Sequence, residues 1–229
     1  AHKGTFGRAL IVAGSLNYTG AACLAGAAAV RAGVGLVTMA LPAAIHTAVV
    51  SHLVEATYLP LPCEQGFISA EAAKVLLEHI QGYDAMLLGP GLGRSKDTEA
   101  FVRTLLESRT MLPPTVIDAD GLNIVAGIEG WTGMLPAATI LTPHPGEMAR
   151  LTGRLTGEIQ ADRVAMARAY AALWKQVVVL KGAYTVIAAP DGRVVIEPFA
   201  NPGLAKAGTG DVLAGTIVAL RAQGMGAFE

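Results

Sequence analysis

Short apolar runs alternate regularly along this chain with longer stretches of helical spacing. Such short, largely apolar runs are typical of strands buried on both faces of a parallel sheet. We predict strands over Arg8–Ala13, Leu36–Leu41, Ala85–Leu88, Thr115–Ile117 and Thr139–Leu141. Helices are predicted over Thr19–Ala32, Ser69–Ile80, a segment capped by Ser95, Glu158–Leu173, and Thr209 to about Ala222.

Near the carboxyl terminus the pattern changes to closely spaced β runs. Strands are predicted over Val177–Leu180, Tyr184–Ala188 and Arg193–Ile196, and the turn at Pro190-Asp191-Gly192 favours a hairpin. The class is therefore α/β: a three-layer sandwich with a mostly parallel central sheet, helices on both faces and a late β-hairpin. No linker or low-complexity stretch divides residues 1–229, which predicts a single domain.

Glycine and polar residues cluster directly after five of the predicted strands. The clusters are Gly14-Ser15, Gly89–Gly93, Asp118–Gly121, Thr142–Glu147 and Lys181-Gly182. In open α/β sheets ligands bind at the carboxyl ends of the strands, where such clusters would meet. We expect one ligand site at this edge.

The sharpest single segment runs from Asn201 to Asp211 and leads into the last helix. Gly208 and Gly210, on either side of Thr209, allow the backbone to approach a ligand closely. The free N–H groups of the following helix then form a hole for a phosphate. Asp211 lies in the first turn, where it can accept a proton from an attacking hydroxyl. The simpler alternative is that Asp211 only favours the helix dipole.

Composition and missing motifs exclude several functions. The net charge of −1 lacks the basic surplus of a nucleic-acid binder, and no apolar run is long enough to predict a membrane span. Walker A, dinucleotide GxGxxG after the first strand, HExxH and GxSxG patterns are missing. Two distant cysteines, Cys23 and Cys63, fit buried thiols in a reducing cytoplasm.

Taken together, these segments resemble the ADP/ATP-dependent NAD(P)H-hydrate dehydratases, a branch of the ribokinase-like superfamily. The matching pieces are His2–Gly7, Ala13–Ala22, Gly89–Gly93, Leu141–Glu147, Leu180–Gly182 with Thr185, and Asn201–Asp211. They occur in family order over nearly the whole chain. Other ribokinase-like kinases share only the generic glycine–Asp element.

The resemblance implies a repair reaction on the S epimer of hydrated NADH or NADPH. ADP or ATP would phosphorylate the ring hydroxyl, and loss of phosphate, driven by the ring nitrogen, would restore the reduced cofactor. The resemblance also implies Mg²⁺, a cytoplasmic enzyme and a homo-oligomer, commonly a tetramer. Family members usually carry further helical segments at both ends, which the chain from Ala1 to Glu229 is expected to lack.

The family pattern also implies the role of each site residue. Asp211 would be the base, and Gly208, Thr209 and Gly210 the anion hole. Ala22, Gly91, His144 and Asp211 would bind the hydrate, and Lys181, Gly182, Ala183, Tyr184, Thr185 and Gly210 the nucleotide. Glu147 would reach the magnesium shell, through water.

Several of these residues have a plainer interpretation. Lys181 could be a solvated charge, His144 a rigid turn, and Glu147 a carboxylate that favours a helix dipole. Asp118 and Asp120 with Asn123 could shape the site or cap the next helix. His46, His52 and His79 show no ligand spacing and are predicted to be surface or satisfied histidines.

Two other functions stay open on the sequence. A vitamin-precursor or sugar kinase of the same superfamily would share the glycine–Asp element, although Thr142–Glu147 beside His2–Gly7 is not expected there. A non-catalytic nucleotide-binding subunit is the second alternative, and the presence of Asp211 argues against it.

Overall fold

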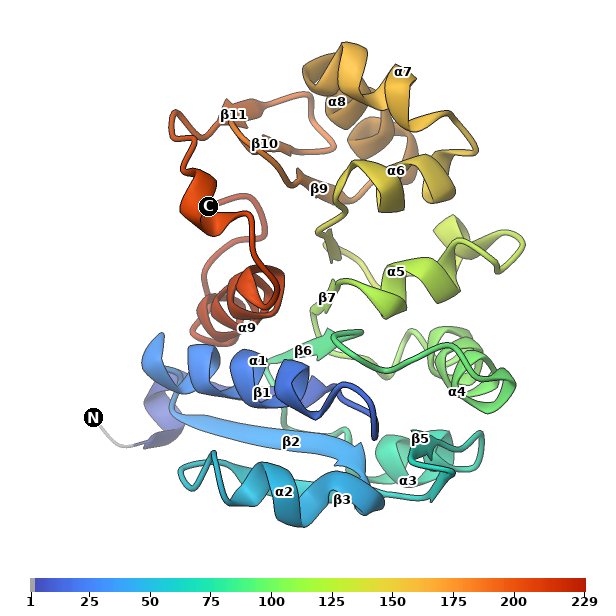
Figure 1. Ribbon diagram of the computed structural model, residues 1–229, viewed down its shortest axis with the longest axis vertical. Helices are drawn as coiled ribbons and strands as arrows, with labels where there is room; N and C mark the ends of the chain where they lie inside the picture. Colours follow the sequence, from blue (N-terminus) through green and yellow to red (C-terminus); the bar gives the residue numbers. More distant parts are fainter. Residues whose placement is uncertain (1–2) are drawn as a thin grey trace.

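The computed structural model describes residues 3–229 and is built on one nine-stranded sheet (Figure 1). The strand order is β11-β10-β9-β8-β7-β6-β1-β2-β3, and a separate hairpin pairs β4 with β5. The strands are β1 Arg8–Val12, β2 Leu36–Pro42, β3 Thr57–Leu61, β4 Cys63–Glu64, β5 Phe67–Ile68, β6 Ala85–Leu88, β7 Thr115–Ile117, β8 Ile140–Leu141, β9 Val177–Leu180, β10 Val186–Ala188 and β11 Val194–Ile196.

Seven neighbouring strands of the large sheet, from β3 to β9, run parallel. The hairpin strands β10 and β11 then add antiparallel at the edge. The parallel strands end at the same edge of the sheet, so the loops that follow them are brought together. The predicted fold class, with its mostly parallel sheet and late hairpin, is confirmed.

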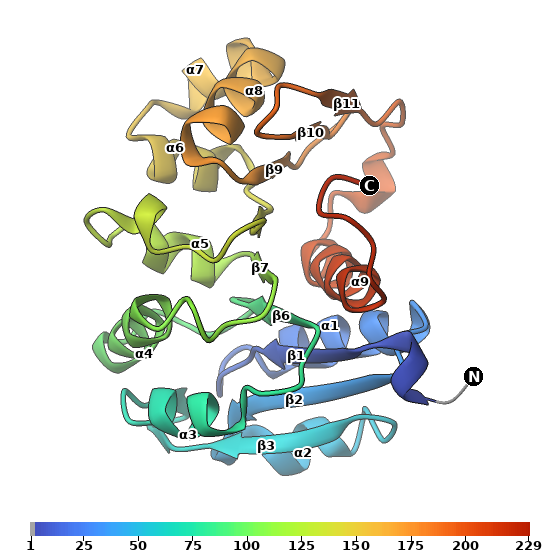
Figure 2. The same cartoon turned by 180° about the vertical axis from the view of Figure 1, so that it is seen from behind.

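Helices cover both faces of the sheet (Figures 1 and 2). Buried side chains of α1, α2 and α9 pack on one face, and those of α3 to α8 on the other. The helices are α1 Thr19–Arg31, α2 His46–Val50, α3 Ala72–His79, α4 Lys96–Glu107, α5 Asp120–Val125, α6 Pro145–Thr152, α7 Thr156–Ala161, α8 Arg163–Trp174 and α9 Thr209–Ala222. No helix in this part of the chain is long and apolar enough to cross a membrane.

Most predicted elements are confirmed to within three residues at each end, and β6, β7, β9 and α9 are confirmed over their full ranges. The single helix predicted over Glu158–Leu173 is wrong, because the chain breaks at Asp162 into α7 and α8. The Asp162 side chain accepts a hydrogen bond from Ala165 N, at 2.9 Å, which starts a new helix instead of continuing the old one. The elements α2, β3, β4 and β5 were not predicted.

Candidate active site

The predicted strand-end clusters meet at one edge of the sheet. They follow β1, β6, β7, β8 and β9, which are consecutive and parallel in the strand order. The amino end of α9 approaches the same edge: a Cβ placed at Gly210 would lie 3.7 Å from Lys181 Nζ and 3.9 Å from Asp118 Oδ2. The structure therefore brings Asp211's helix to the polar groups that follow β7 and β9.

The first hydrogen bond of α9 runs from Val212 N to Gly208 O at 3.1 Å. The backbone N–H groups that precede Val212 in the helix therefore have no acceptor within it. Gly208 has φ +91° and offers no side-chain cap. The Thr209 hydroxyl donates to Leu204 O or Lys206 O, both at 3.0 Å, and so holds the preceding turn against the helix. An uncapped helix start of this kind is suited to an anion.

Lys181 lies in a buried cluster with two carboxylates. Its Nζ is 2.5 Å from Asp118 Oδ1 and 3.7 Å from Glu147 Oε2. The Asp118 carboxylate is almost fully buried and also accepts from the Thr142 hydroxyl at 2.7 Å. Lys181 is thus an ion-paired residue of the strand-end cluster and not a solvated charge.

Asp211 sits in an environment that opposes its ionisation. Burial, followed by repulsion from Asp118 and Asp120, raises the pKa of Asp211 from its ordinary 3.8 to about 6, against the attraction of Lys181. A carboxylate with a raised pKa is a stronger proton acceptor once ionised, and at neutral pH most of it is ionised. This is the balance that a general base requires.

His144 and Glu147 together cap α6. His144 Nδ1 accepts from Gly146 N at 3.0 Å and from Glu147 N at 3.3 Å, while Glu147 Oε2 accepts from His144 N at 2.8 Å. The arrangement is a reciprocal capping box. His144 and Glu147 therefore both have a structural role at the start of α6. His144 is nevertheless exposed, next to the Lys181 cluster.

The loop Gly89–Gly93 packs against the start of α1. A Cβ at Gly91 would lie 2.7 Å from Tyr18 Cβ and 2.8 Å from Ala21 Cβ, so the loop closes on the start of α1. Ala22, the next residue of α1, is fully buried in the core and faces Gly14 instead. The buried Ser15 hydroxyl donates to Gly91 O at 2.8 Å. On the other side, Asp120 Oδ2 accepts from Gly93 N at 2.9 Å.

The run Lys181–Thr185 forms the turn between β9 and β10. The Thr185 hydroxyl donates to Gly182 O at 2.9 Å, and Tyr184 N donates to Phe199 O at 3.3 Å. Gly182, Ala183 and Tyr184 are exposed, so the turn is open to a ligand.

The structure shows what contacts the side chains have whose roles the sequence did not decide. Asp118 pairs with Lys181, Asp120 holds the Gly93 amide, and neither side chain caps α5. Asn123 Oδ1 accepts from Arg150 instead. The rings of His52 and His79 contact carbonyls of their own helices or turns, and His46 packs edge-on against Tyr58.

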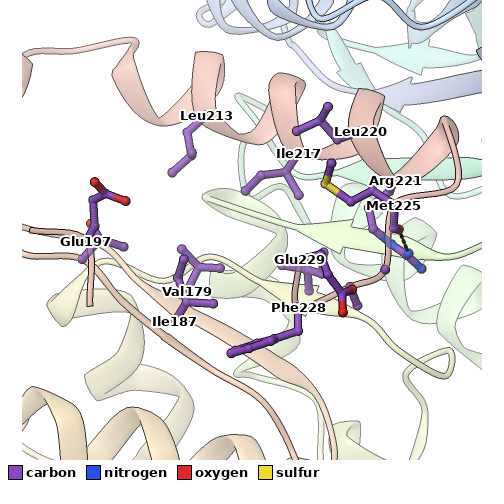
Figure 3. Close-up of a pocket in the computed structure, with 14 residues that line it drawn as sticks. Val179, Ile187, Glu197, Leu213, Ile217, Leu220, Arg221, Met225, Phe228 and Glu229 are labelled. Atoms are coloured by element: carbon purple, nitrogen blue, oxygen red, sulfur yellow. Dashed lines mark hydrogen bonds between the residues drawn. The ribbon is translucent and has the colours of Figure 1, made fainter. Parts of the chain in front are cut away.

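A separate apolar pocket of about 270 Å³ lies between α9 and the strands β9 and β10 (Figure 3). Figure 3 shows Leu213, Ile217 and Leu220 of α9 on one side and Val179 with Ile187 on the other. Among the predicted site residues, which all lie in the described part of the chain, only Thr185 lines this pocket. The pocket therefore touches the Lys181–Thr185 turn but is distinct from the polar cluster.

Comparison with known proteins agrees with this geometry. The sequence profile described as NAD(P)H-hydrate dehydratase matches residues 9–229. The chain belongs to the NAD(P)H-hydrate dehydratase family. A dehydratase of Bacillus subtilis, named as ADP-dependent and specific for the S epimer, is 39% identical over 221 residues, which are 96% of this chain and 74% of that protein.

Two further similarities support the family. The bifunctional NAD(P)H-hydrate repair enzyme of Moorella thermoacetica is 45% identical over 98% of this chain, and the chain spans only 42% of that relative's length. The crystal structure of the Bacillus subtilis dehydratase, co-crystallised with ATP and Mg²⁺, superposes with a TM-score of 0.80 at 36% identity, covering 97% of this chain and 74% of that one. The predicted resemblance and the ribokinase-like fold are confirmed.

Proposed function

We propose that this dehydratase-family chain converts the S epimer of hydrated NADH or NADPH back to the reduced cofactor, with ADP or ATP as phosphoryl donor. The observation that carries the proposal is the meeting of Asp211, the uncapped start of α9 and the Lys181–Asp118 pair at one sheet edge. Family membership supplies the substrate class. The named relatives from Bacillus subtilis support a nucleotide-dependent reaction.

The residues support two consecutive steps. Asp211 takes the proton from the ring hydroxyl, whose oxygen attacks the terminal phosphorus of the nucleotide while the P–O bond to the leaving AMP or ADP breaks. The free N–H groups of Thr209, Gly210 and Asp211, together with Lys181, stabilise the charge on the phosphoryl oxygens. The ring nitrogen then expels the phosphate from the phosphorylated hydrate, and loss of a proton from the neighbouring carbon restores the double bond.

Two regions of the edge supply the binding surfaces. In this proposal Gly91 and the exposed ring of His144 contact the hydrate, whereas Ala22, which is fully buried, only shapes that surface from below. The turn Lys181–Thr185 and Gly210 bind the nucleotide. The positions fit these roles because the Gly91 loop and the Lys181 turn lie on opposite sides of Asp118, following β6 and β9 in the sheet.

Magnesium fits this site only as an ion shared with the nucleotide. Within residues 3–229, no three His, Cys, Asp or Glu side chains are grouped to hold a metal ion. Mg²⁺ keeps several waters and takes phosphate oxygens readily, and when bound it would neutralise phosphate charge. We propose that Glu147 contacts one of those waters, since its buried carboxylate lies in the Lys181 cluster.

The decisive experiment is a repair assay on chemically prepared hydrated NADH. The chain is incubated with the hydrate and ADP or ATP, and the absorbance of the reduced nicotinamide is followed. We expect recovery that depends on the nucleotide, with AMP formed from ADP. A vitamin-precursor or sugar kinase would leave the hydrate unchanged. The proposal is refuted if the chain consumes nucleotide with a vitamin precursor or a sugar but not with the hydrate.

We also propose, on the family resemblance alone, that the enzyme is cytoplasmic and homo-oligomeric. Sedimentation of the purified chain tests the second point, with a tetramer as the expected species.

A further inference from the structure

An arginine of α8 donates hydrogen bonds to the turn that contains Lys181. Arg163 is the first residue of α8, and its guanidinium reaches the end of β9. Nη2 donates to Leu180 O at 2.8 Å and Nη1 donates to Ala183 O at 2.5 Å. These two carbonyls lie on either side of Lys181 and Gly182, so one planar group holds both ends of that dipeptide.

The fit between the guanidinium and the turn is tight. Gly182 has φ +148°, and a Cβ placed there would lie 2.9 Å from Arg163 Nη2. A side chain at position 182 would therefore push the guanidinium off the turn. The glycine and the arginine form a matched pair.

Arg163 is at the amino end of α8, where a positive side chain does not stabilise the helix. The amino end of a helix carries the positive end of the dipole, which disfavours a positive side chain. Partial burial lowers the pKa of the Arg163 guanidinium, and its buried Nε has no hydrogen-bond partner. The two bonds to the turn offset these costs, so the position is better explained by the turn than by the helix.

We propose that Arg163 is a positioning residue for nucleotide binding, which fixes the Lys181–Thr185 turn so that Lys181 meets the phosphates. The inference rests on the proposed function, because that function makes the turn a nucleotide contact. Arg163 acts through the turn and does not itself touch the reacting atoms.

Two substitutions test the proposal against a matched control. Arg163→Met keeps an apolar stem and loses both donors, while Arg163→Lys keeps the charge but cannot bridge two carbonyls as a fork. Arg168→Met is the control, because Arg168 is exposed on the same helix and makes one long contact, from Nε to Gly192 O at 3.4 Å. Circular dichroism confirms that each variant is folded.

The first readout is ADP binding by titration calorimetry. We expect both Arg163 variants to bind ADP about tenfold more weakly, as for loss of charge-assisted hydrogen bonds, and Arg168→Met to bind as the parent does. In the repair assay the KM for ADP should rise, with kcat at saturating ADP within about twofold of the parent. Equal ADP affinity in the Arg163 variants and the parent overturns the proposal.

The second readout is amide hydrogen exchange without nucleotide. Residues 181–185 should exchange faster in both Arg163 variants and at the parental rate in Arg168→Met. Unchanged exchange there also overturns the positioning role. A parent chain that binds no ADP would instead contradict the proposed function, and the exchange result would still decide whether Arg163 orders the turn.

Discussion

Among the helices that begin at this edge of the sheet, α6 and α9 differ in how their first N–H groups are satisfied. The start of α6 is closed by its own side chains, since His144 and Glu147 satisfy its first N–H groups and the N–H of His144. The start of α9 follows Gly208, which has no side chain to offer. Both helices carry an acidic residue in the first turn, Glu147 in one and Asp211 in the other.

On the proposed function, this difference separates a helix end that is closed by its own side chains from one that binds phosphate. A capped end has no donors left for a ligand, whereas an open end keeps them for an anion. The carboxylates differ as well: Glu147 Oε2 accepts a backbone N–H, and Asp211 is held in surroundings that raise its pKa to about 6. We expect substitutions at the two ends to affect different properties, in the order that follows.

The largest effect is expected from Asp211→Asn. Without the base, kcat in the repair assay should fall by about 10³-fold, while ADP affinity by calorimetry changes little. Asp97→Asn is the matched control, because Asp97 lies exposed in the first turn of α4. Turnover that survives in Asp211→Asn would exclude its role as base.

The second largest effect is expected from Gly208→Ala, because alanine at this position must adopt a φ of +91°. The strain is about 1–3 kcal/mol, and relieving it would shift the start of α9, so we expect turnover to fall by roughly ten- to a hundredfold. Gly153→Ala is the control at a comparable φ of +69°, with open space around it at the end of α6. That variant should lose stability and keep its activity. Equal activities in the two variants would argue against an anion hole at α9.

The pH dependence of kcat/KM should show the raised pKa of Asp211 directly. A base with a pKa of about 6 loses activity below that pH, about tenfold per unit. Asp118→Asn removes a like charge, so its acid limb should move to lower pH, and its maximal rate should fall because Lys181 loses its partner. An acid limb that stays in place in Asp118→Asn would contradict this coupling.

A smaller effect concerns stability. The folded-state pKa of Asp211 lies above its ordinary 3.8, so the folded chain binds this proton more tightly than the unfolded chain does. The associated stability is complete below pH 3.8 and is lost as the pH rises through about 6. Asp211→Asn avoids that loss, and at pH 7 its free energy of unfolding should exceed the parent's by roughly 1–2 kcal/mol, less than the full shift because solvent screens this partly exposed carboxylate. Denaturant unfolding at pH 7 and pH 4 measures it, and the gain should shrink at pH 4.

The smallest effect is expected from Glu147→Gln. The amide oxygen can still accept from His144 N, but the favourable charge at the helix start is lost, so stability should fall by about 1 kcal/mol. If Glu147 also contacts a magnesium-bound water, the Mg²⁺ concentration for half-maximal activity should rise several-fold. An unchanged Mg²⁺ dependence would leave Glu147 as a cap only.

Local sequence patterns were sufficient to predict the α/β class, the late hairpin and the convergence of the glycine and polar clusters. These follow from local apolar patterns and from the rule that parallel strands end at one edge, which needs no knowledge of partners. The run Asn201–Asp211 likewise predicted the uncapped helix start, because glycine and the following helix are adjacent in the chain.

The pairing of side chains, by contrast, follows from three-dimensional packing. Lys181 and Asp118 are 63 residues apart, and nothing in the sequence distinguishes this pairing from one with Asp120. The break at Asp162 and the reach of Arg163 to the Lys181 turn were missed because the helical spacing continues across the break. Such contacts depend on the three-dimensional packing of α8 against β9, and local sequence patterns carry no record of that packing.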